Sequence, residues 1–482
     1  MNLRHLSNQT ALFALLVLAG CKVGPNYTKA PAMPAPPPAA YSDNGHNGAW
    51  TTATPADGTD RGTWWAIYQD AQLNTLEQQC ATANQNIAAA LHAYEQAHDL
   101  VREVHSSLFP TVSLGGSANR NRISSTRPLR PANSAQDYWD FLIPLNISWE
   151  PDLWGAVRRQ IESASASAQA SAADLANTRL SLQGMLATTY LQIRGIDLQA
   201  QLLRSTIEAF AASLQLTKDR FTGGLASESD VEQATAQLEE TRAQLVDLGV
   251  QRAQYEHAIA VLVGVAATGF HIAENPIVGD PPSIPTGIPS ELLQRRPDIA
   301  TAERRVASAN ALIGVAKAAY YPTVSLGASG SIESDAITSL FNSGSAGWNA
   351  GPGINETLFD AGRRKAQVDY ALAQREQATA LYRQQVLSAF RDVEDQLAAL
   401  RVLEEEAAVQ DRAVASARRS TELATLRYKR GLALYLEVLT DQTIELTDER
   451  AAAALTARRI VAAAQLQIAL GGGWDATQLP KN

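Results

Sequence analysis

The fold of this chain is decided by a short stretch that occurs twice: residues 109–115 read FPTVSLG, and residues 321–327 read YPTVSLG. The second copy begins 212 residues after the first. In both copies apolar and polar residues alternate, which is the period of a β-strand with one apolar face. The duplication therefore predicts a chain built from two similar halves.

Three further pairs of segments recur in the same order along the chain. LWGAVRR at 153–159 returns as LFDAGRR at 358–364, RFTGGLA at 220–226 as RYKRGLA at 427–433, and VLVG at 261–264 as IALG at 468–471. These pairs are 205 to 207 residues apart, so the insertions and deletions between the halves are small. We expect two tandem repeats of one architecture.

Each half contains two segments with strand-like alternation. They are 108–119 and 141–150 in the first half, and 321–333 and 348–357 in the second. Segments of about ten such residues with aromatics are typical of transmembrane β-strands, although a half-buried soluble hairpin has the same pattern. Four strands cannot close a barrel, and an open sheet edge is not tolerated in lipid. Strands that cross a membrane would therefore belong to a barrel shared by several chains.

Most of the remaining sequence predicts long coiled-coil helices. Apolar residues follow a 4-3 spacing from Leu182 to Leu214 and again from Val231 to Leu262, where only Arg252 interrupts the stripe. An ordinary long bundle would give the same stripe. We expect helices over about 227–263, 366–425 and 437–470.

Short motifs predict how these helices begin and end. In each half, basic residues are followed by glycine, at Gly224 in the first half and at Gly431 in the second. This order is typical of a helix end and predicts a tight helical hairpin turn in each half. The repeated arginine pairs at 158–159 and 363–364 follow strand–helix junctions and indicate solvated helix starts, with contact to lipid headgroups as the alternative.

The first residues predict an export signal. Arg4 is followed by the apolar run 11–18 and by Leu18-Ala19-Gly20-Cys21. The run is too short to span a bilayer as a helix, and no later run reaches about 18 apolar residues. Cleavage before Cys21 would remove one arginine and no acid, so the net charge would change from −9 to −10.

Composition and missing motifs exclude several classes of protein. The 482 residues carry a net charge of −9, which excludes a basic nucleic-acid binder. Two cysteines, Cys21 and Cys80, exclude a disulfide scaffold and a four-cysteine metal site. The sequence has no phosphate-binding loop, no zinc-protease motif and no hydrolase elbow. We therefore predict no catalytic residues, no metal site and no cofactor.

Several motifs resemble one family. CKVGPNY at 21–27, Trp64-Trp65, LLQRRPDI at 292–299 and the paired PTVSLG strands are similar to the TolC-like outer-membrane factor family, specifically the NodT/OprM-type efflux lipoproteins. The quartet ending at Cys21 is similar to a bacterial lipoprotein box, which implies that Cys21 is acylated. Lys22 follows it rather than the aspartate that often retains such lipoproteins in the inner membrane, which favours the outer membrane.

The resemblance implies a fold and a function. The fold is mostly α with β, and a homotrimer forms a 12-strand β-barrel continued by an α-helical barrel through the periplasm. The protein is then a passive, lipid-anchored outer-membrane channel that conducts drugs or other small solutes. Its partners would be an inner-membrane pump, a periplasmic adaptor and outer-membrane lipid, and not nucleic acid.

The resemblance also implies site residues. The helical tips that face the adaptor comprise Gly224, Leu225, Ala226 and Ser227 in the first half and Gly431, Leu432 and Ala433 in the second. The periplasmic gate comprises Leu436, Leu439, Thr440 and Asp441. The family often has an aspartate where Thr440 stands, so a carboxylate ring is not assured here. The alternative is that both leucines belong to an ordinary coiled-coil core.

The expected organisation follows from these observations. It comprises a signal peptide at 1–20, an extended arm at 21–62, a first efflux repeat at 63–272, a linker at 273–288, a second repeat at 289–474 and a tail at 475–482. Two other functions stay open: an exit duct of a protein-secretion system, and a coiled-coil lipoprotein that forms no channel. The alternating segments favour a channel, because a coiled-coil lipoprotein would not need them.

Overall fold

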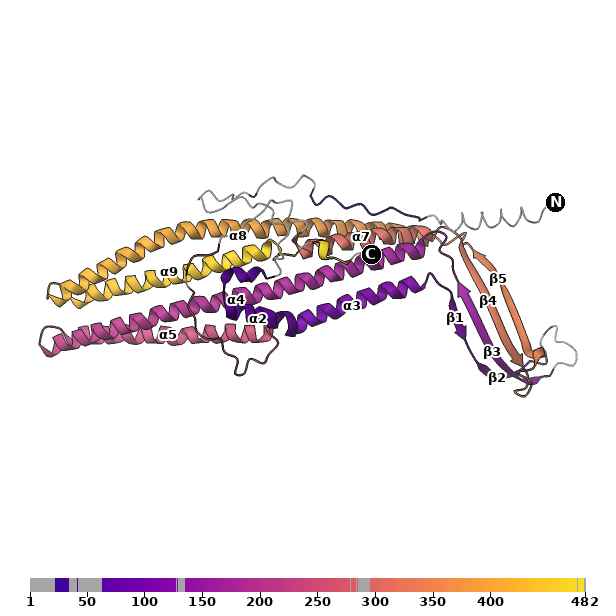
Figure 1. Ribbon diagram of the computed structural model, residues 1–482, viewed down its shortest axis with the longest axis horizontal. Helices are drawn as coiled ribbons and strands as arrows, with labels where there is room; N and C mark the ends of the chain where they lie inside the picture. Colours follow the sequence, from indigo (N-terminus) through magenta and orange to yellow (C-terminus); the bar gives the residue numbers. More distant parts are fainter. Residues whose placement is uncertain are drawn as a thin grey trace.

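The molecule is a long helical body with a small sheet bent away at one end (Figure 1). This computed structural model describes residues 22–33, 41, 63–126, 128, 135–277, 279–282, 284, 295–474 and 476–480. Long helices and five strands in two repeats confirm the predicted mostly-α fold with β. No helix within these ranges is both long and apolar enough to cross a membrane.

The six long helices form three pairs of equal length. The 22-residue pair is α3 (Gln85–Ser106) and α7 (Pro297–Ala318), the 67-residue pair is α4 (Ala156–Thr222) and α8 (Arg363–Lys429), and the 35-residue pair is α5 (Glu228–Leu262) and α9 (Tyr435–Ala469). A 67-residue helix is roughly 100 Å long. The equal lengths confirm that the two halves share one architecture, and the helix ends lie within a few residues of those predicted.

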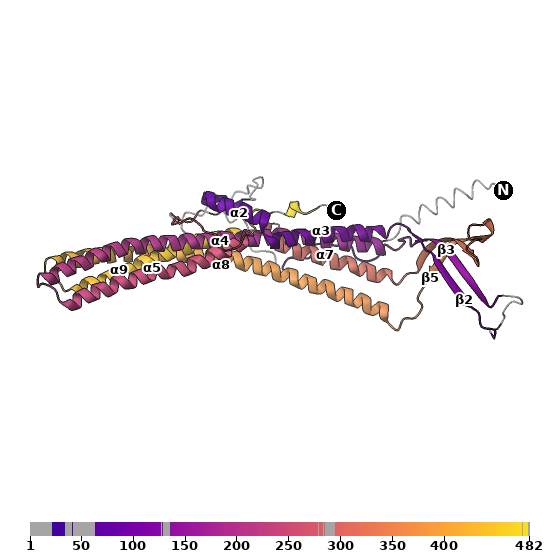
Figure 2. The same ribbon diagram turned by 90° about the horizontal axis from the view of Figure 1, so that it is seen from below.

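The helices form one curved layer. In the half nearer the sheet, α3, α4, α7 and α8 lie side by side in that order, with α3 and α8 at opposite edges (Figures 1 and 2). In the other half α5 packs on α4, α4 on α9, and α9 on α8. The short elements η1 (Trp64–Tyr68), α2 (Ala71–Ala83) and η4 (Ala476–Gln478) lie near the middle of the body.

The core follows the predicted 4-3 stripe. Leu186, Ile193 and Leu203 of α4 are fully buried. Leu186 and Ile193 belong to a hydrophobic cluster around α2 and the middle of α4, and Leu203 belongs to a cluster near the tips. A third cluster lies between α7, α8 and α9. The coiled-coil pattern therefore describes side chains that pack between helices.

The sheet is antiparallel and joins the two halves. Its strands are β1 (Thr111–Leu114), β2 (Ser117–Arg122), β3 (Asp137–Trp149), β4 (Thr323–Ser334) and β5 (Ala346–Asn355), with the 3-10 turn η3 (Ser343–Ser345) before β5. The order is β1-β3-β4-β5, and β2 also pairs with β3. The central β3–β4 pair thus connects the first half to the second.

The first predicted strand, 108–119, is divided in the structure. β1 and β2 keep one register against β3, and the gap falls at Gly115, which lies opposite Pro144. Gly115 N–H donates to Pro144 O at 2.9 Å, but proline has no N–H to return the bond. The strand begins at Thr111 because residues 107–109 form the turn that ends α3.

Candidate functional site

The sheet has one apolar and one polar face. Partners in an antiparallel pair share a face, so the register assigns every side chain to one of the two. The apolar face comprises Val112, Leu114, Ile143, Leu145, Ile147, Trp149, Val324, Leu326, Ile332, Trp348 and Ile354. The opposite face carries Thr111, Ser113, Asn146, Ser148, Ser325, Ser329, Asn349 and several glycines.

In the described part of the chain, much of both faces of this sheet is exposed. Trp348 is 85% exposed, Ile354 74% and Leu114 72%. Both outer edges are also open, since in the described part of the chain β1 and β2 pair only with β3, and β5 only with β4. A sheet with a bare apolar face and two free edges is suited to lipid on one side and to further strands at each edge.

The segment that follows Cys21 is attached to the junction of sheet and helices. Cys21 itself lies outside the described residues. Arg159 of α4 is fully buried, and its guanidinium donates to the carbonyl oxygens of Val23 and Gly24, each at 3.0 Å, and to the Asn26 side chain. The prediction of a solvated Arg159 is therefore wrong, because the arm covers it.

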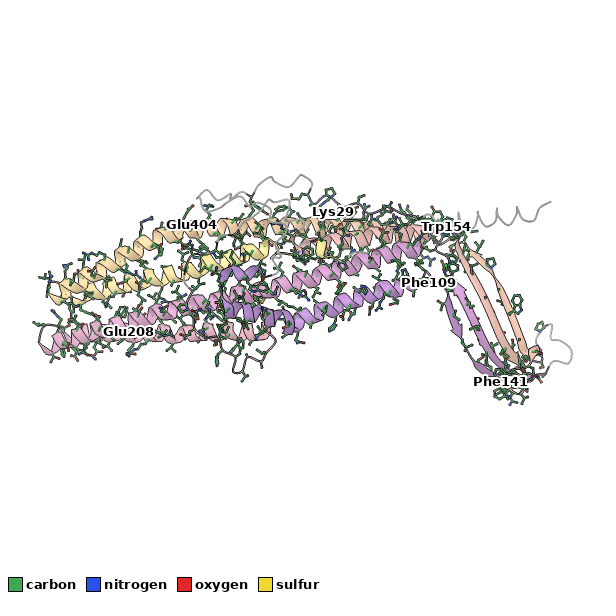
Figure 3. All side chains as sticks on the ribbon, viewed as in Figure 1. Lys29, Phe109, Phe141, Trp154, Glu208 and Glu404 are labelled. Atoms are coloured by element: carbon green, nitrogen blue, oxygen red, sulfur yellow. The ribbon has the colours of Figure 1, made fainter. Side chains whose placement is uncertain are left out.

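Other contacts hold the same arm in place. Val23 N–H donates to the carbonyl oxygen of Trp154, which lies at the junction (Figure 3). Lys22 forms an ion pair with Glu162. Burial alone would raise the pKa of Glu162, but hydrogen bonds from Lys22 and Arg159 keep this pKa below its usual value. The residue next to Cys21 is thus fixed at the base of the sheet.

Each predicted helical tip is a tight turn closed by glycine. Gly224 and Gly431 have φ of +75° and +73°. The next residue in each turn donates its N–H to the carbonyl oxygen of the residue five positions earlier in the preceding helix. Leu225 donates to Arg220 and Leu432 to Arg427, at 2.8 Å in both cases. Ser227 begins α5 with a capping box in which Ser227 and Asp230 each bond the other's backbone N–H.

The tips expose apolar side chains. Leu225, Leu432 and Leu434 are between 65% and 77% exposed, while Ala226 and Ala433 are half-buried. Behind the tips a cavity of about 740 Å³ lies between α4, α8 and α9, with Phe210 and Leu446 among its apolar lining and Glu445 among its acids. The tips therefore offer apolar contacts beside an open groove.

One arginine joins the two tips of the chain. Arg220, at the end of α4, donates to the carbonyl oxygen of Lys429 at 3.2 Å and lies 4.6 Å above the Tyr428 ring. Tyr428 in turn packs edge-on against Tyr435 at the start of α9. The sequence indicated Arg220 only as a basic residue in a last turn, and its partner is visible only once the halves are placed side by side.

The predicted gate residues point in two directions. Leu436 is 57% exposed, and exposed Thr440 donates its hydroxyl to the Leu436 carbonyl oxygen. Leu439 is half-buried against the cluster near the tips. Asp441 accepts a hydrogen bond of 2.9 Å from Ser420 of α8. Leu436 and Thr440 therefore share an exposed surface of the chain. Leu439 and Asp441 instead contact other residues of the same chain.

A buried polar network holds the middle of the body. Asp197 pairs with Arg194 at 3.1 Å and with Arg252 at 2.8 Å, and Arg252 also pairs with Glu256 at 2.6 Å. The two arginines donate further to the carbonyl oxygens of residues 272 and 273, which follow α5. The sequence signal for this network was the charge of Arg252 within an apolar stripe.

Comparison with known proteins adds independent information. The family profile described as outer membrane efflux protein matches residues 76–265 and 288–472. The solvent efflux pump outer membrane protein SrpC of Pseudomonas putida is 30% identical over 97% of this chain and 98% of its own. The pyoverdine export outer membrane protein OpmQ of Pseudomonas aeruginosa is 31% identical over 87% of this chain and 89% of its own. The solved structure of the outer-membrane channel OprN has a TM-score of 0.85 at 29% identity, and the match covers 94% of this chain and 100% of OprN.

Proposed function

This chain belongs to the outer membrane efflux protein family and is an efflux channel rather than an enzyme, and from that premise we propose that three copies share one barrel and one helical tunnel. In this proposal the channel is passive. An inner-membrane pump supplies the energy, and a periplasmic adaptor joins the pump to the helical tips.

The sheet with one apolar and one polar face is the observation that carries the proposal. Its apolar face is suited to the hydrocarbon of a bilayer, and its serine, asparagine and glycine face is suited to a water-filled lumen. β1 and β2 share one register on β3 and count as one strand, so the described part of one chain supplies the equivalent of four strands with two free edges. Three chains would pair edge to edge into 12 strands, which removes every free edge.

The attached arm supports a lipid anchor at Cys21. The contacts of Arg159 and Glu162 begin at Lys22, so an acyl group on Cys21 would start at the base of the sheet. Acyl chains at that level would enter the inner leaflet while the helices extend into the periplasm. The anchor would therefore hold the chain in the orientation that the barrel needs.

The tips support docking and gating at the opposite end. Residues 224–227 and 431–433 present exposed leucines beside the groove between α4, α8 and α9. Leu436, Leu439, Thr440 and Asp441 lie just behind them, so an adaptor bound at the tips could move the gate. Arg220 would hold the tips together in the closed state. A closed form opened by a partner is a two-state element.

The proposed cargo is drugs or other small solutes. The relatives named above export a solvent and pyoverdine, and both are small molecules. This similarity favours efflux over the exit duct of a protein-secretion system. The wide difference between the two cargoes fits a passive channel in which the pump selects the solute.

The first test is the mass of the detergent-extracted protein after the detergent contribution is subtracted. We expect three times the mass of the mature chain, and stepwise conductance after insertion of that particle into a planar bilayer. A monomer that leaves the membrane fraction without detergent would contradict the shared barrel and would favour the coiled-coil lipoprotein that forms no channel.

A further inference from the structure

The register of β2 places two arginines on the apolar face of the sheet. Arg120 lies opposite Trp139 of β3, and Arg122 lies opposite Asp137. Trp139 and Asp137 are an even number of residues from Leu145, so they share its face, and strand partners share a face as well. Both arginines are exposed. Two guanidiniums on a face suited to hydrocarbon need a partner, because a charge in the middle of a bilayer is costly.

Two tryptophans of β3 mark the height of the apolar band. Trp149 lies at the base of the sheet, where its indole N–H donates to the carbonyl oxygen of Leu108 at 2.9 Å. Trp139 lies ten residues earlier, near the end of the sheet farthest from the helices (the outer end), where Figure 3 labels Phe141. Ten residues extend about 33 Å along a strand, and a tilt of about 40° reduces this to about 25 Å of height. The apolar band of a transmembrane barrel has this height and is flanked by aromatic residues at both edges.

The two arginines therefore lie at the outer edge of this band and not in its middle. Arg120 is level with Trp139, and its guanidinium carbon is 5.7 Å from the centre of the Trp139 ring. Trp139 also stacks on Phe141, with 5.6 Å between the ring centroids. Arg122 is two residues further along the strand, which is about 5 Å higher after the same tilt. Lipid headgroups begin at this level, since aromatic belts lie at the boundary between hydrocarbon and headgroups.

Charge at the outer end of the sheet differs between the two faces. The polar face carries the carboxylates of Asp140 and Glu333 at this end. On the apolar face the described strands carry the two arginines against one carboxylate, that of Asp137, and Asp335 follows in the turn after β4. The strands therefore present net positive charge towards the headgroups and negative charge towards the lumen. This division favours an anionic partner on the outside of the barrel.

We propose that Arg120 and Arg122 bind the phosphate groups of an anionic lipid in the outer leaflet. The inference rests on the proposed membrane-spanning barrel and adds a lipid site to it. A guanidinium donates two parallel hydrogen bonds to a phosphate, and residues two apart on one strand face are about 7 Å apart, close enough to hold one headgroup together. Trp139 and Phe141 would contact the acyl chains just below that headgroup. A free phosphate ion would gain nothing from these aromatic rings, so they favour a lipid.

Lipid titration of the detergent-extracted, full-length protein tests the site. The wild type and the variant Arg120→Gln with Arg122→Gln are titrated with bisphosphoryl lipid A, a glycolipid that carries two phosphates. Native mass spectrometry counts the lipids bound to each trimer. We expect the variant to bind this lipid about tenfold more weakly than the wild type, because each arginine near a membrane surface adds attraction to an anionic lipid. Phosphatidylcholine, whose headgroup has no net charge, should bind both proteins equally.

A charge-swapped variant is the matched control. It combines Arg120→Gln and Arg122→Gln with Asn119→Arg and Asn121→Arg, which keeps the net charge and moves both guanidiniums to the polar face of β2. We expect this variant to bind bisphosphoryl lipid A as weakly as the double glutamine variant does. Binding equal to that of the wild type would overturn the site, because overall charge and not its position on the outer face would then attract the lipid.

The outcomes separate this inference from the proposed function. A trimeric glutamine variant that binds the lipid as tightly as the wild type overturns the site and leaves the shared barrel standing. Displacement of the lipid by inorganic phosphate overturns the lipid as the occupant. If the glutamine variant does not assemble, the wild type decides alone: it should bind bisphosphoryl lipid A more tightly than the same lipid without phosphates, and equal affinities overturn the site. A wild-type chain that is a monomer by mass overturns the barrel, and the site with it.

Discussion

Arg220 is a side chain that contacts both helical tips of a chain. Its guanidinium lies over the Tyr428 ring and donates to the Lys429 carbonyl oxygen. A cation–π contact contributes about 0.5–2 kcal/mol, and a hydrogen bond contributes about 1 kcal/mol. About 1.4 kcal/mol changes an equilibrium tenfold. The contacts of Arg220 are therefore strong enough to shift the equilibrium between a closed and an open tip.

Replacement of Arg220 by alanine should therefore favour the open tip. We expect the Arg220→Ala channel to be open about ten times more often than the wild type in single-channel recordings without an adaptor. Arg242→Ala is the control, because Arg242 pairs with its neighbour Glu239 on the exposed side of α5. Equal open times for Arg220→Ala and wild type would show that the tips are held by other contacts.

Glu77 of α2 predicts a dependence of stability on pH. The carboxyl is fully buried, and neither oxygen has a hydrogen-bond partner among the described residues. Burial raises the pKa of Glu77 to about 9. The folded chain keeps this proton up to about pH 9, whereas the unfolded chain loses it near pH 4.5. Stability should therefore decrease as pH rises between these values.

Glu77→Gln removes the ionisable group and should remove this loss. We expect the variant and the wild type to unfold at the same temperature near pH 4.5. The variant should become more stable than the wild type as pH rises, by an amount on the order of 1 kcal/mol per pH unit. Thermal unfolding measured at several pH values checks this. Glu95→Gln on the exposed side of α3 is the control, and a Glu77→Gln curve parallel to the wild type would contradict the prediction.

The helices that follow the two tips begin differently. α5 starts at a capping box between Ser227 and Asp230, while α9 starts after Leu434, whose side chain caps nothing. A lost cap costs about 1 kcal/mol at the helix end. Ser227→Ala should therefore increase hydrogen exchange of the first amides of α5 about fivefold and leave those of α9 unchanged. Faster exchange at both helices would mean that the tips open together.

The sequence predicted the elements whose apolar residues recur with the period of a helix or a strand. The helix expected at 227–263 spans 228–262, and the stripe through Leu203 is buried. The sequence did not predict the features that depend on contact between two segments far apart in the chain. The break at Gly115 depends on Pro144 in the partner strand, and the burial of Arg159 depends on the arm. The Arg220 contact required the two halves side by side, which no local pattern contains.

Among the described residues of one chain, both layers end at unfilled edges. The sheet ends at β1 and β5, and the helical layer ends at α3 and α8. The same two halves that close on each other inside a chain leave equivalent surfaces free on either side. A ring of copies fills both kinds of edge at once, so the barrel and the tunnel would form in a single assembly step rather than independently.

The orientation of the sheet faces gives the sharpest test at the scale of the whole assembly. Leu145 and Asn146 are neighbours in β3, both are exposed, and they lie on opposite faces. An arginine on a lipid-facing position near the middle of a bilayer costs about 2–4 kcal/mol, and each trimer would bear this cost three times. Leu145→Arg should therefore greatly reduce the amount of trimer extracted from the outer membrane. Asn146→Arg should insert normally and shift the channel's ion selectivity towards anions, because its charge would lie in the lumen. If Asn146→Arg instead blocked insertion while Leu145→Arg did not, the faces would be reversed, and equal insertion of both would place the sheet outside the bilayer.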